Sequence, residues 1–368
     1  MMMKNKAIVI LVFIIIVISS GVFLISKSRT KTSHIEISKD SDIRIVPTMN
    51  DEIAQDTTWC GTFQLVWNDM IKEVVHQDVK FDEQLAMVDN LNKQDFNEES
   101  ISEEYYYKKF GLKTLNLKKE IENGIKEKFN EKSAILDAID WSDSALHQEN
   151  SSIRRYIFYA MLKREFTYKE EFDKLENGDF AGIYKDVEYF GINDRTDRKT
   201  RNQVDVLYYN SEDDCAVCLN TIEGDEVILC KGLNGLTFNE IYEDITEKSN
   251  AYTGKKAFLE TDYLKIPKIS FDTKKEYTEL QRKVFYSAEG EEVQIEKAIQ
   301  SIQMELDEKG GKIKSEAVID VTTNAAMLVE KEKPRYFNFD DKYVVFLKEN
   351  GKDKPYFAAT ISDITKFQ

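Results

Sequence analysis

The side chains best suited to chemistry in this sequence are four cysteines, three histidines and many carboxylates. Cys215 and Cys218 form a C-x-x-C pair, but no second pair and no nearby histidine completes a zinc site. His34, His76 and His147 lie far apart, outside any H-E-x-x-H motif. With 67 acidic residues, neighbouring carboxylates carry little information, so a glycosidase-like pair is only a remote alternative. Since nucleophile elbows and phosphate-binding loops are also missing, we expect no enzyme, no metal and no small-molecule cofactor.

Cys215, Cys218 and Cys230 all fall in the stretch DCAVCLNTIEGDEVILC, which has the pattern of a β-hairpin. The fourth cysteine, Cys60, lies elsewhere in the chain. Its two apolar runs flank Glu223-Gly224-Asp225, which is a typical turn sequence. If three residues form the turn, Cys218 and Cys230 face each other across the strands and could form a disulfide in an exported protein. The equally open alternative is that both thiols pack as small apolar side chains.

An uncharged apolar run begins the chain. Residues 7–25 (AIVILVFIIIVISSGVFLI) are close to the length that crosses a bilayer core of about 30 Å. A cleaved signal peptide is the alternative, because Ser19 and Gly21 are small enough for signal peptidase. The run continues past them to Ile25, which favours an anchor. Basic residues flank both ends, so the positive-inside rule discriminates poorly.

These features predict three parts in the chain. We expect a membrane anchor or uncleaved signal over residues 1–26, a polar stem over 27–56 and one soluble domain over 57–368. The domain is expected outside the cytoplasm at the cell surface, or secreted if the N-terminal segment is cleaved.

The composition argues against several classes of protein. The net charge of −16 argues against a nucleic-acid partner, because phosphate binding needs basic surface. The 42% of hydrophobic residues supply a substantial core, and only four prolines argue against a disordered or fibrous chain. Abundant Lys, Asn, Ile, Asp and Glu are typical of a bacterial protein.

Hydrophobic periodicity predicts an α+β domain. Residues 59–75 have helical spacing, as do parts of 81–129, while the run Tyr105-Tyr106-Tyr107 is expected to pack rather than bind carbohydrate. Residues 153–162 (IRRYIFYAML) read as a buried strand, and alternating runs recur from there to the C-terminus. Helices followed by many strands indicate α+β rather than α/β.

The C-terminal half, roughly residues 150–364, resembles the serpin family segment by segment. The run FNFDDKYVVFL followed by KENGKDKPYFAATISDI is similar to the closing signature of serpins: Asp340 matches, while Lys342 replaces the proline and Tyr343 the phenylalanine. Residues 263–271 (YLKIPKISF) resemble the V-x-L-P-K-F strand of the family.

Two further segments carry the resemblance. Residues 214–246 look like the paired strands and short helix that precede that strand. Residues 153–172 are similar to the central strand N-A-x-Y-F-K-G-x-W, in which Ala160 and Lys163 match and Phe166 takes the tryptophan position. The order of the segments is that of the family, but no motif is intact and the S-P-x-S motif after the first helix is missing.

The resemblance implies a fold with N-terminal helices, a large mixed β-sheet and a second C-terminal sheet. It also implies a serine protease as partner. An inhibitory serpin exposes a bait loop that, once cleaved, inserts into the main sheet. The hinge of that loop would lie within residues 306–321, where Gly311 and every second residue after it are small or apolar; the hinge residues are Glu308, Gly310, Gly311, Ile313, Ser315 and Ala317.

The bait loop would follow the hinge. Counting forward from Glu308 places the scissile bond near Asn324-Ala325, and counting back from Tyr343 places it nearer Glu330-Lys331. The residues expected to contact a protease are Thr323, Asn324, Ala325, Met327, Leu328 and Lys331. Because the usual hinge alanines are missing and Lys312 and Lys314 should slow insertion, a non-inhibitory extracellular binding or structural module on a similar scaffold is the alternative function.

Overall fold

The computed structural model describes residues 43–141, 156–311 and 333–368. The chain divides into two compact units, residues 1–39 and 40–368, and all described residues belong to the second unit. The predicted anchor, residues 7–25, therefore lies outside the described residues. Within the described ranges, no helix is both long and apolar enough to cross a membrane.

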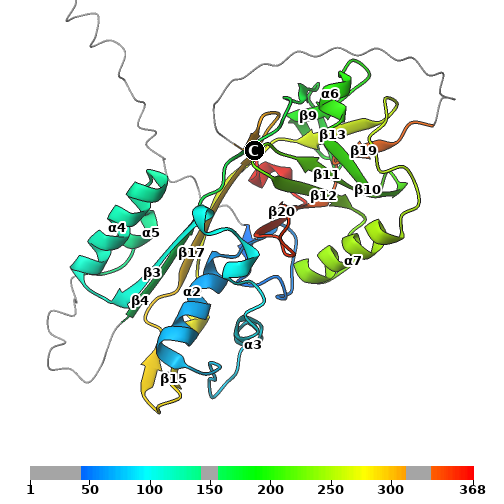
Figure 1. The fold of residues 1–368 in the computed structure, drawn as a ribbon. Coiled ribbons are helices and arrows are strands. Elements are labelled where there is room, and N and C mark those ends of the chain that lie inside the picture. Colours follow the sequence, from blue (N-terminus) through cyan, green and yellow to red (C-terminus); the bar gives the residue numbers. More distant parts are fainter. Residues whose placement is uncertain (1–42, 142–155, 312–332) are drawn as a thin grey trace, which may run out of the picture. The chain divides into compact units, whose positions relative to one another are not determined.

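A seven-stranded sheet forms the centre of the second unit (Figure 1). Its ladders are antiparallel except between β1 and β2. The strands, in spatial order, are β1 (Arg44–Ile45), β2 (Thr57–Cys60), β21 (Phe357–Ile361), β20 (Tyr343–Glu349), β12 (Asp225–Lys231), β11 (Asp214–Asn220) and β10 (Val204–Ser211).

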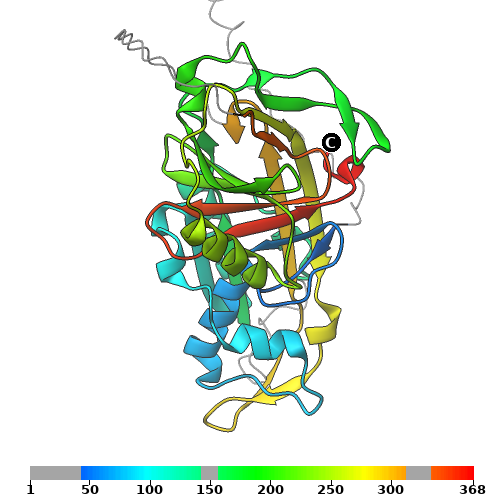
Figure 2. The same cartoon turned by 90° about the vertical axis from the view of Figure 1, so that its right-hand side faces the viewer.

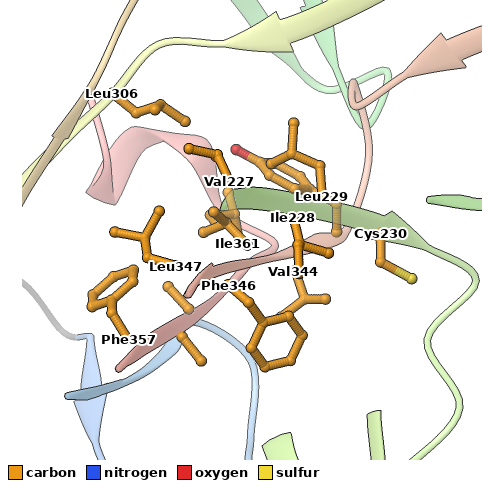
Figure 3. Close-up of a cluster of buried hydrophobic side chains, with 14 of the residues drawn as sticks. Val227, Ile228, Leu229, Cys230, Leu306, Val344, Phe346, Leu347, Phe357 and Ile361 are labelled. Carbon is orange, nitrogen blue, oxygen red and sulfur yellow. The ribbon is translucent and has the colours of Figure 1, made fainter. Parts of the chain in front are cut away.

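The central strands are almost wholly buried, as their continuous apolar sequences predict. Helix α7 (Phe238–Ala251) covers one face, where Phe238 and Tyr242 place their rings 6.1 and 5.4 Å from that of Phe346 (Figure 2). Leu306 belongs to the same core cluster as the side chains of β12, β20 and β21 (Figure 3). This sheet is therefore the rigid base of the described molecule.

A second, four-stranded sheet has the order β19 (Tyr336–Asn338), β13 (Tyr263–Pro267), β9 (Tyr189–Ile192) and β6 (Asp173–Lys174). Two small hairpins form separate two-stranded sheets: β7 (Gly178–Phe180) with β8 (Tyr184–Val187), and β15 (Val284–Tyr286) with β16 (Glu292–Gln294).

Three more ladders concern the candidate site. They pair β3 (Tyr106–Leu112) with β4 (Tyr156–Leu162), β14 (Ile269–Glu276) with β17 (Ile299–Leu306), and β5 (Phe166–Thr167) with β18 (Gly310–Gly311). All three are antiparallel.

The helices form two satellite clusters. Helix α2 (Thr62–Met70), its π-helical continuation Ile71–Val75 and α3 (Ala86–Asn92) bury Phe63, Trp67 and Val88 in a cluster with Phe285. Helices α4 (Leu115–Phe129) and α5 (Ala134–Asp137) bury Ile121 and Leu136 with Tyr159 of β4. The remaining helix is α6 (Arg198–Arg201), and short 3₁₀ turns span Glu98–Ser100, Glu103–Tyr105, Thr278–Leu280 and Ile364–Lys366.

The expected α+β class with a large sheet is found, and several boundaries differ from the sequence-based ones. The first helix begins at Thr62 rather than at residue 59, because Thr58–Cys60 pair with β21. Residues 106–112 form a strand inside the range predicted as helical. The expected strand over 263–271 is two strands, β13 and β14, which belong to different sheets. Residues from the predicted stem, including Ile43 and Ile45, lie in the core.

The cysteine hairpin forms, but its predicted facing pair is wrong. Thr221 and Asp225 close the turn, the backbone N–H of Thr221 donating to the Asp225 carbonyl at 3.1 Å. This register places Cys218 opposite Ile228 and Cys230 opposite Ala216. All four cysteines are free and buried, and burial raises the pKa of the Cys218 thiol above its usual range. The thiols thus pack as small side chains, which was the alternative interpretation.

Candidate functional site

The candidate site lies where two strand pairs of the molecule meet. Strand β4 pairs only with β3, and β17 pairs only with β14, among the residues that the structure describes. Each of β4 and β17 therefore has one edge whose backbone groups belong to no ladder. Such edges can accept a further strand, because their N–H and C=O groups are already aligned for pairing.

One short strand, β18, already lies between these pairs. Gly310 and Gly311 pair with Thr167 and Phe166 of β5, which continues the chain after β4. On the other side, Asp307 and Gly310 form an antiparallel bridge that turns β17 into β18. Because both relations are antiparallel, β17 and the β4–β5 segment run in the same direction on either side of β18. The two strand pairs converge towards this point in Figure 1.

We call the paired segments Phe166–Phe172 and Glu308–Gly311 the clamp. Besides the β5–β18 ladder, the backbone N–H of Tyr168 donates to the Lys309 carbonyl at 3.0 Å, and that of Phe172 to the Glu308 carbonyl at 2.9 Å. Gly310 has φ +122°, and a Cβ there would come within 2.3 Å of the Phe166 carbonyl oxygen. Only glycine fits this close approach.

Glu308 fixes the clamp through two ion pairs. Its side chain is 4% exposed, with Oε1 3.0 Å from Lys174 Nζ and Oε2 3.0 Å from Lys268 Nζ. Burial alone would raise the pKa of this carboxyl, but hydrogen bonds from its own backbone N–H and from Lys268 and Lys174 outweigh it and lower the pKa to about 2. Glu308 is thus ionised and joins β6, where Lys174 lies, to the start of β14.

The turn between β11 and β12 supports the other side of the clamp. Glu223 Oε2 accepts from the backbone N–H of Thr167 at 2.7 Å, and the Ile222 N–H donates to the Thr167 carbonyl at 2.8 Å. Next to it, Arg164 Nε donates to both carboxylate oxygens of Asp225 at 2.7 and 2.8 Å. The clamp is therefore held against the rigid seven-stranded sheet.

Helix α5 reaches both strand pairs. It contacts β17, and its Leu136 packs with Tyr159 of β4 in the α4–α5 cluster. A strand entering between β4 and β17 would consequently meet α5.

The chain resumes after residue 332 at a second strong attachment. Arg335 donates from Nε and Nη2 to the two carboxylate oxygens of Asp262 at 3.1 and 2.6 Å, and from Nη1 to the Lys255 carbonyl at 2.7 Å. Asp262 is fully buried. Residues 312–332 are therefore bounded by the clamp on one side and by this bidentate ion pair on the other.

The structure brings together only the first part of the predicted hinge. Glu308, Gly310 and Gly311 all lie in the clamp. The other predicted residues lie outside the described residues: Ile313, Ser315, Ala317, Thr323, Asn324, Ala325, Met327, Leu328 and Lys331. For these residues, a role in the hinge or the bait loop remains a prediction.

Sequence reasoning missed the partners of the hinge. Lys174, Arg164 and the pair Arg335–Asp262 carry no local pattern, since each contacts residues far away in the chain. Lys268 stands out only as the lysine of the L-P-K-F-like run. No group of three or more His, Cys, Asp or Glu in the described ranges could hold a metal ion. What this site can do is exchange backbone pairing.

No protein-family model matches the sequence, and no curated protein matches it. Solved structures similar to the chain include Serpin48 of the insect Tenebrio molitor, with 14% identity and a TM-score of 0.41 over 67% of this chain and 64% of that one, just under two thirds of its length. Serpin-12 of Manduca sexta has 13% identity and a TM-score of 0.47 over 86% of this chain and 95% of that one.

Human thyroxine-binding globulin complexed with thyroxine is similar as well, with 10% identity and a TM-score of 0.42 over 80% of this chain and 94% of that one. Because these TM-scores are below 0.5, the contacts of this chain itself carry the proposal below. The similarity concerns the fold alone, and it is the remote resemblance to serpins that the sequence predicted.

Proposed function

We propose that the protein accepts an additional strand between β4 and β17, supplied by its own residues after Gly311, and that it thereby inhibits a serine-type endopeptidase. The observation that carries this proposal is the position of β18. It forms two residues of a strand between β5 and β17, while the edges of β4 and β17 stay unpaired in the described ranges. Extending β18 would satisfy both edges at once.

The two registers set at β18 agree on which side chains an extended strand would bury. Continued from the Gly311–Phe166 pair, Ser315 falls opposite Leu162; continued from the Asp307–Gly310 bridge, it falls opposite Ile302. Ile302 is buried, and the buried residues of β17 alternate strictly with exposed ones. Odd-numbered residues would therefore face the core, and these are the small or apolar ones: Gly311, Ile313, Ser315, Ala317, Ile319 and Val321.

Charge also suits this register. Lys312 would fall opposite Glu305 of β17 on one side and opposite Glu165 on the other. Opposite charges directly across a ladder contribute roughly 0.2–1 kcal/mol each. Lys312, which is on the exposed parity, would thus face a carboxylate on each side.

The direct test is incubation of the protein with a panel of serine proteases, read on a denaturing gel. We expect a covalent complex with at least one protease. Limited proteolysis within residues 312–332 should raise the melting temperature, because the released strand completes both ladders. Cleavage with neither complex nor stabilisation would reject strand insertion and inhibition together, and would leave a non-inhibitory extracellular binding or structural module.

The same gel identifies the scissile bond when the released fragment is sequenced. Met327 and Leu328 suit the apolar pocket of a chymotrypsin- or elastase-like enzyme, whereas Lys331 suits a trypsin-like one. We expect the apolar site, because the lysines near residue 331 are flanked by glutamates in a solvated spacer. Complex formation with trypsin-like enzymes alone would reverse this choice.

A further inference from the structure

Some buried polar side-chain atoms have no hydrogen-bond partner in the protein, and two of them, Tyr168 OH and Glu308 Oε2, belong to the clamp. The described ranges contain six such atoms: Arg164 Nη1, Tyr168 OH, Thr261 Oγ1, Glu308 Oε2, Tyr343 OH and Ser362 Oγ. Glu308 Oε2 lies 3.0 Å from Lys268 Nζ, however, so this atom is not without a partner. Tyr168 directly follows the two residues of β5, and Arg164 lies two positions before them. Such groups are rare in native proteins, so the Tyr168 hydroxyl in the clamp calls for a physical reason.

Among these six buried atoms, the Tyr168 hydroxyl is the one whose effect on stability is easiest to measure separately. Its residue is 3% exposed, and its ring meets that of Phe172 edge to face at 4.7 Å. The ring therefore packs well, while the hydroxyl is buried without a hydrogen-bond partner in the protein. The backbone N–H of the same residue donates to Lys309 across the clamp. Separation of the two clamp segments would break this backbone bond.

We propose that the Tyr168 hydroxyl makes the clamp a weak joint, which opens more readily than its buried rings alone would allow. A buried hydroxyl without a partner loses its bonds to water and gains none in the protein, so it penalises the closed state. Opening the clamp returns the hydroxyl to water and removes the penalty. Joints of low local stability are the places where a fold opens first.

The consequence for strand entry rests on the proposed function. An incoming strand must displace the bonds that Glu308 and Lys309 make across the clamp before it can extend β18 in register. A weak joint at Tyr168 would lower this barrier. The weak joint itself is a property of the intact protein and does not depend on any protease.

The test compares Tyr168→Phe with Tyr189→Phe in the otherwise unchanged full chain. Both tyrosines are buried in the same core cluster, and both changes remove one hydroxyl. The Tyr189 hydroxyl, however, donates to the Asp179 carbonyl at 2.8 Å. Amide hydrogen exchange of residues 166–172 is followed by mass spectrometry, and melting temperatures are taken at one scan rate.

We expect Tyr168→Phe to slow exchange in residues 166–172 about fivefold and to raise the melting temperature by about 2 °C. Tyr189→Phe should lower the melting temperature, because it removes a satisfied hydrogen bond. Unchanged or faster exchange in Tyr168→Phe would overturn the proposal, since the hydroxyl then has a partner such as a buried water. If exchange slows but cleavage stabilises neither protein, strand insertion fails while the weak joint stands.

Discussion

Glu308 concentrates more charge pairing than any other residue of the clamp. We expect Glu308→Gln to destabilise the intact protein by about 2 kcal/mol at neutral pH, since it leaves Lys268 without its buried partner. The loss stays below that of a fully buried pair, because Lys174 is 66% exposed. Urea unfolding of the mutant and wild type measures the difference.

The same substitution predicts a pH dependence. The pKa of Glu308 is about 2 in the folded protein and 4.5 as its ordinary value. A depressed pKa stabilises the fold above the ordinary value, and this contribution is lost as the pH falls from about 4.5 towards 2. The stability difference between wild type and Glu308→Gln should therefore shrink over that interval. Glu279→Gln, which touches only a surface pair with Lys275, should show a difference near zero throughout.

Replacing Gly310 would cause both a steric clash of the added Cβ and an unfavourable positive φ, and a control at a second glycine separates the two effects. Gly310→Ala places a Cβ against the Phe166 carbonyl and forces a residue with a side chain to φ +122°. Gly290→Ala is the matched control, because Gly290 also has positive φ (+80°) but open space around it. We expect Gly310→Ala to cost roughly 2–3 kcal/mol and Gly290→Ala about 1 kcal/mol. Equal losses in thermal or urea unfolding would show that the clamp relaxes around the added methyl group.

At the level of elements, the proposed strand predicts that odd-numbered side chains after Gly311 are buried and even-numbered ones are exposed. Ser315→Arg would bury a charge opposite Leu162 and Ile302, which costs several kcal/mol, so it should abolish the covalent complex while the loop is still cleaved. Glu316→Arg, on the exposed parity, should leave complex formation within about threefold of wild type. Complexes of equal yield from both variants would place the strand in another register or outside the sheet.

The elements also show what the sequence could and could not predict. The hairpin of β11 and β12, that of β20 and β21, and helix α4 follow from strong local periodicity. The register of the cysteine hairpin does not, because moving the three-residue turn from residues 223–225 to 222–224 changes the partner of Cys230 from Cys218 to Ala216. Strand β2 looked helical since its side chains continue the pattern of α2, and only the distant partner β21 makes it a strand.

The candidate site was predictable in part for the same reason. The alternation after Gly311 is a local signal, and the resemblance to serpins added Glu308 and Gly310, so these three residues could be named from the sequence. The lysines that contact Glu308 and the arginine that contacts Asp262 are distant in sequence from their partners, so these ion pairs produce no local periodicity. Long-range pairing of this kind is decided by the fold.

At the scale of the whole molecule, we propose that residues 7–25 keep the protein in the membrane with its domain outside the cytoplasm. The full chain and a variant beginning at residue 27 are to be compared by carbonate extraction of membranes. The full chain should stay in the pellet and the shortened chain should be released. Mature protein that starts near Val22 in the soluble fraction would show instead that the segment is a cleaved signal.

The strand order of the seven-stranded sheet also governs how the protein can be made. Strands β20 and β21 lie in the middle of that sheet, between β2 and β12, although they are synthesised after every other strand in it. Without them the sheet falls into two separate pieces, β1–β2 and β10–β12. A nascent chain therefore cannot close its core while the ribosome is still adding residue 343, and the early strands must wait with their apolar faces uncovered. The export that we propose, through a translocation pore that takes unfolded chains, would make use of that delay.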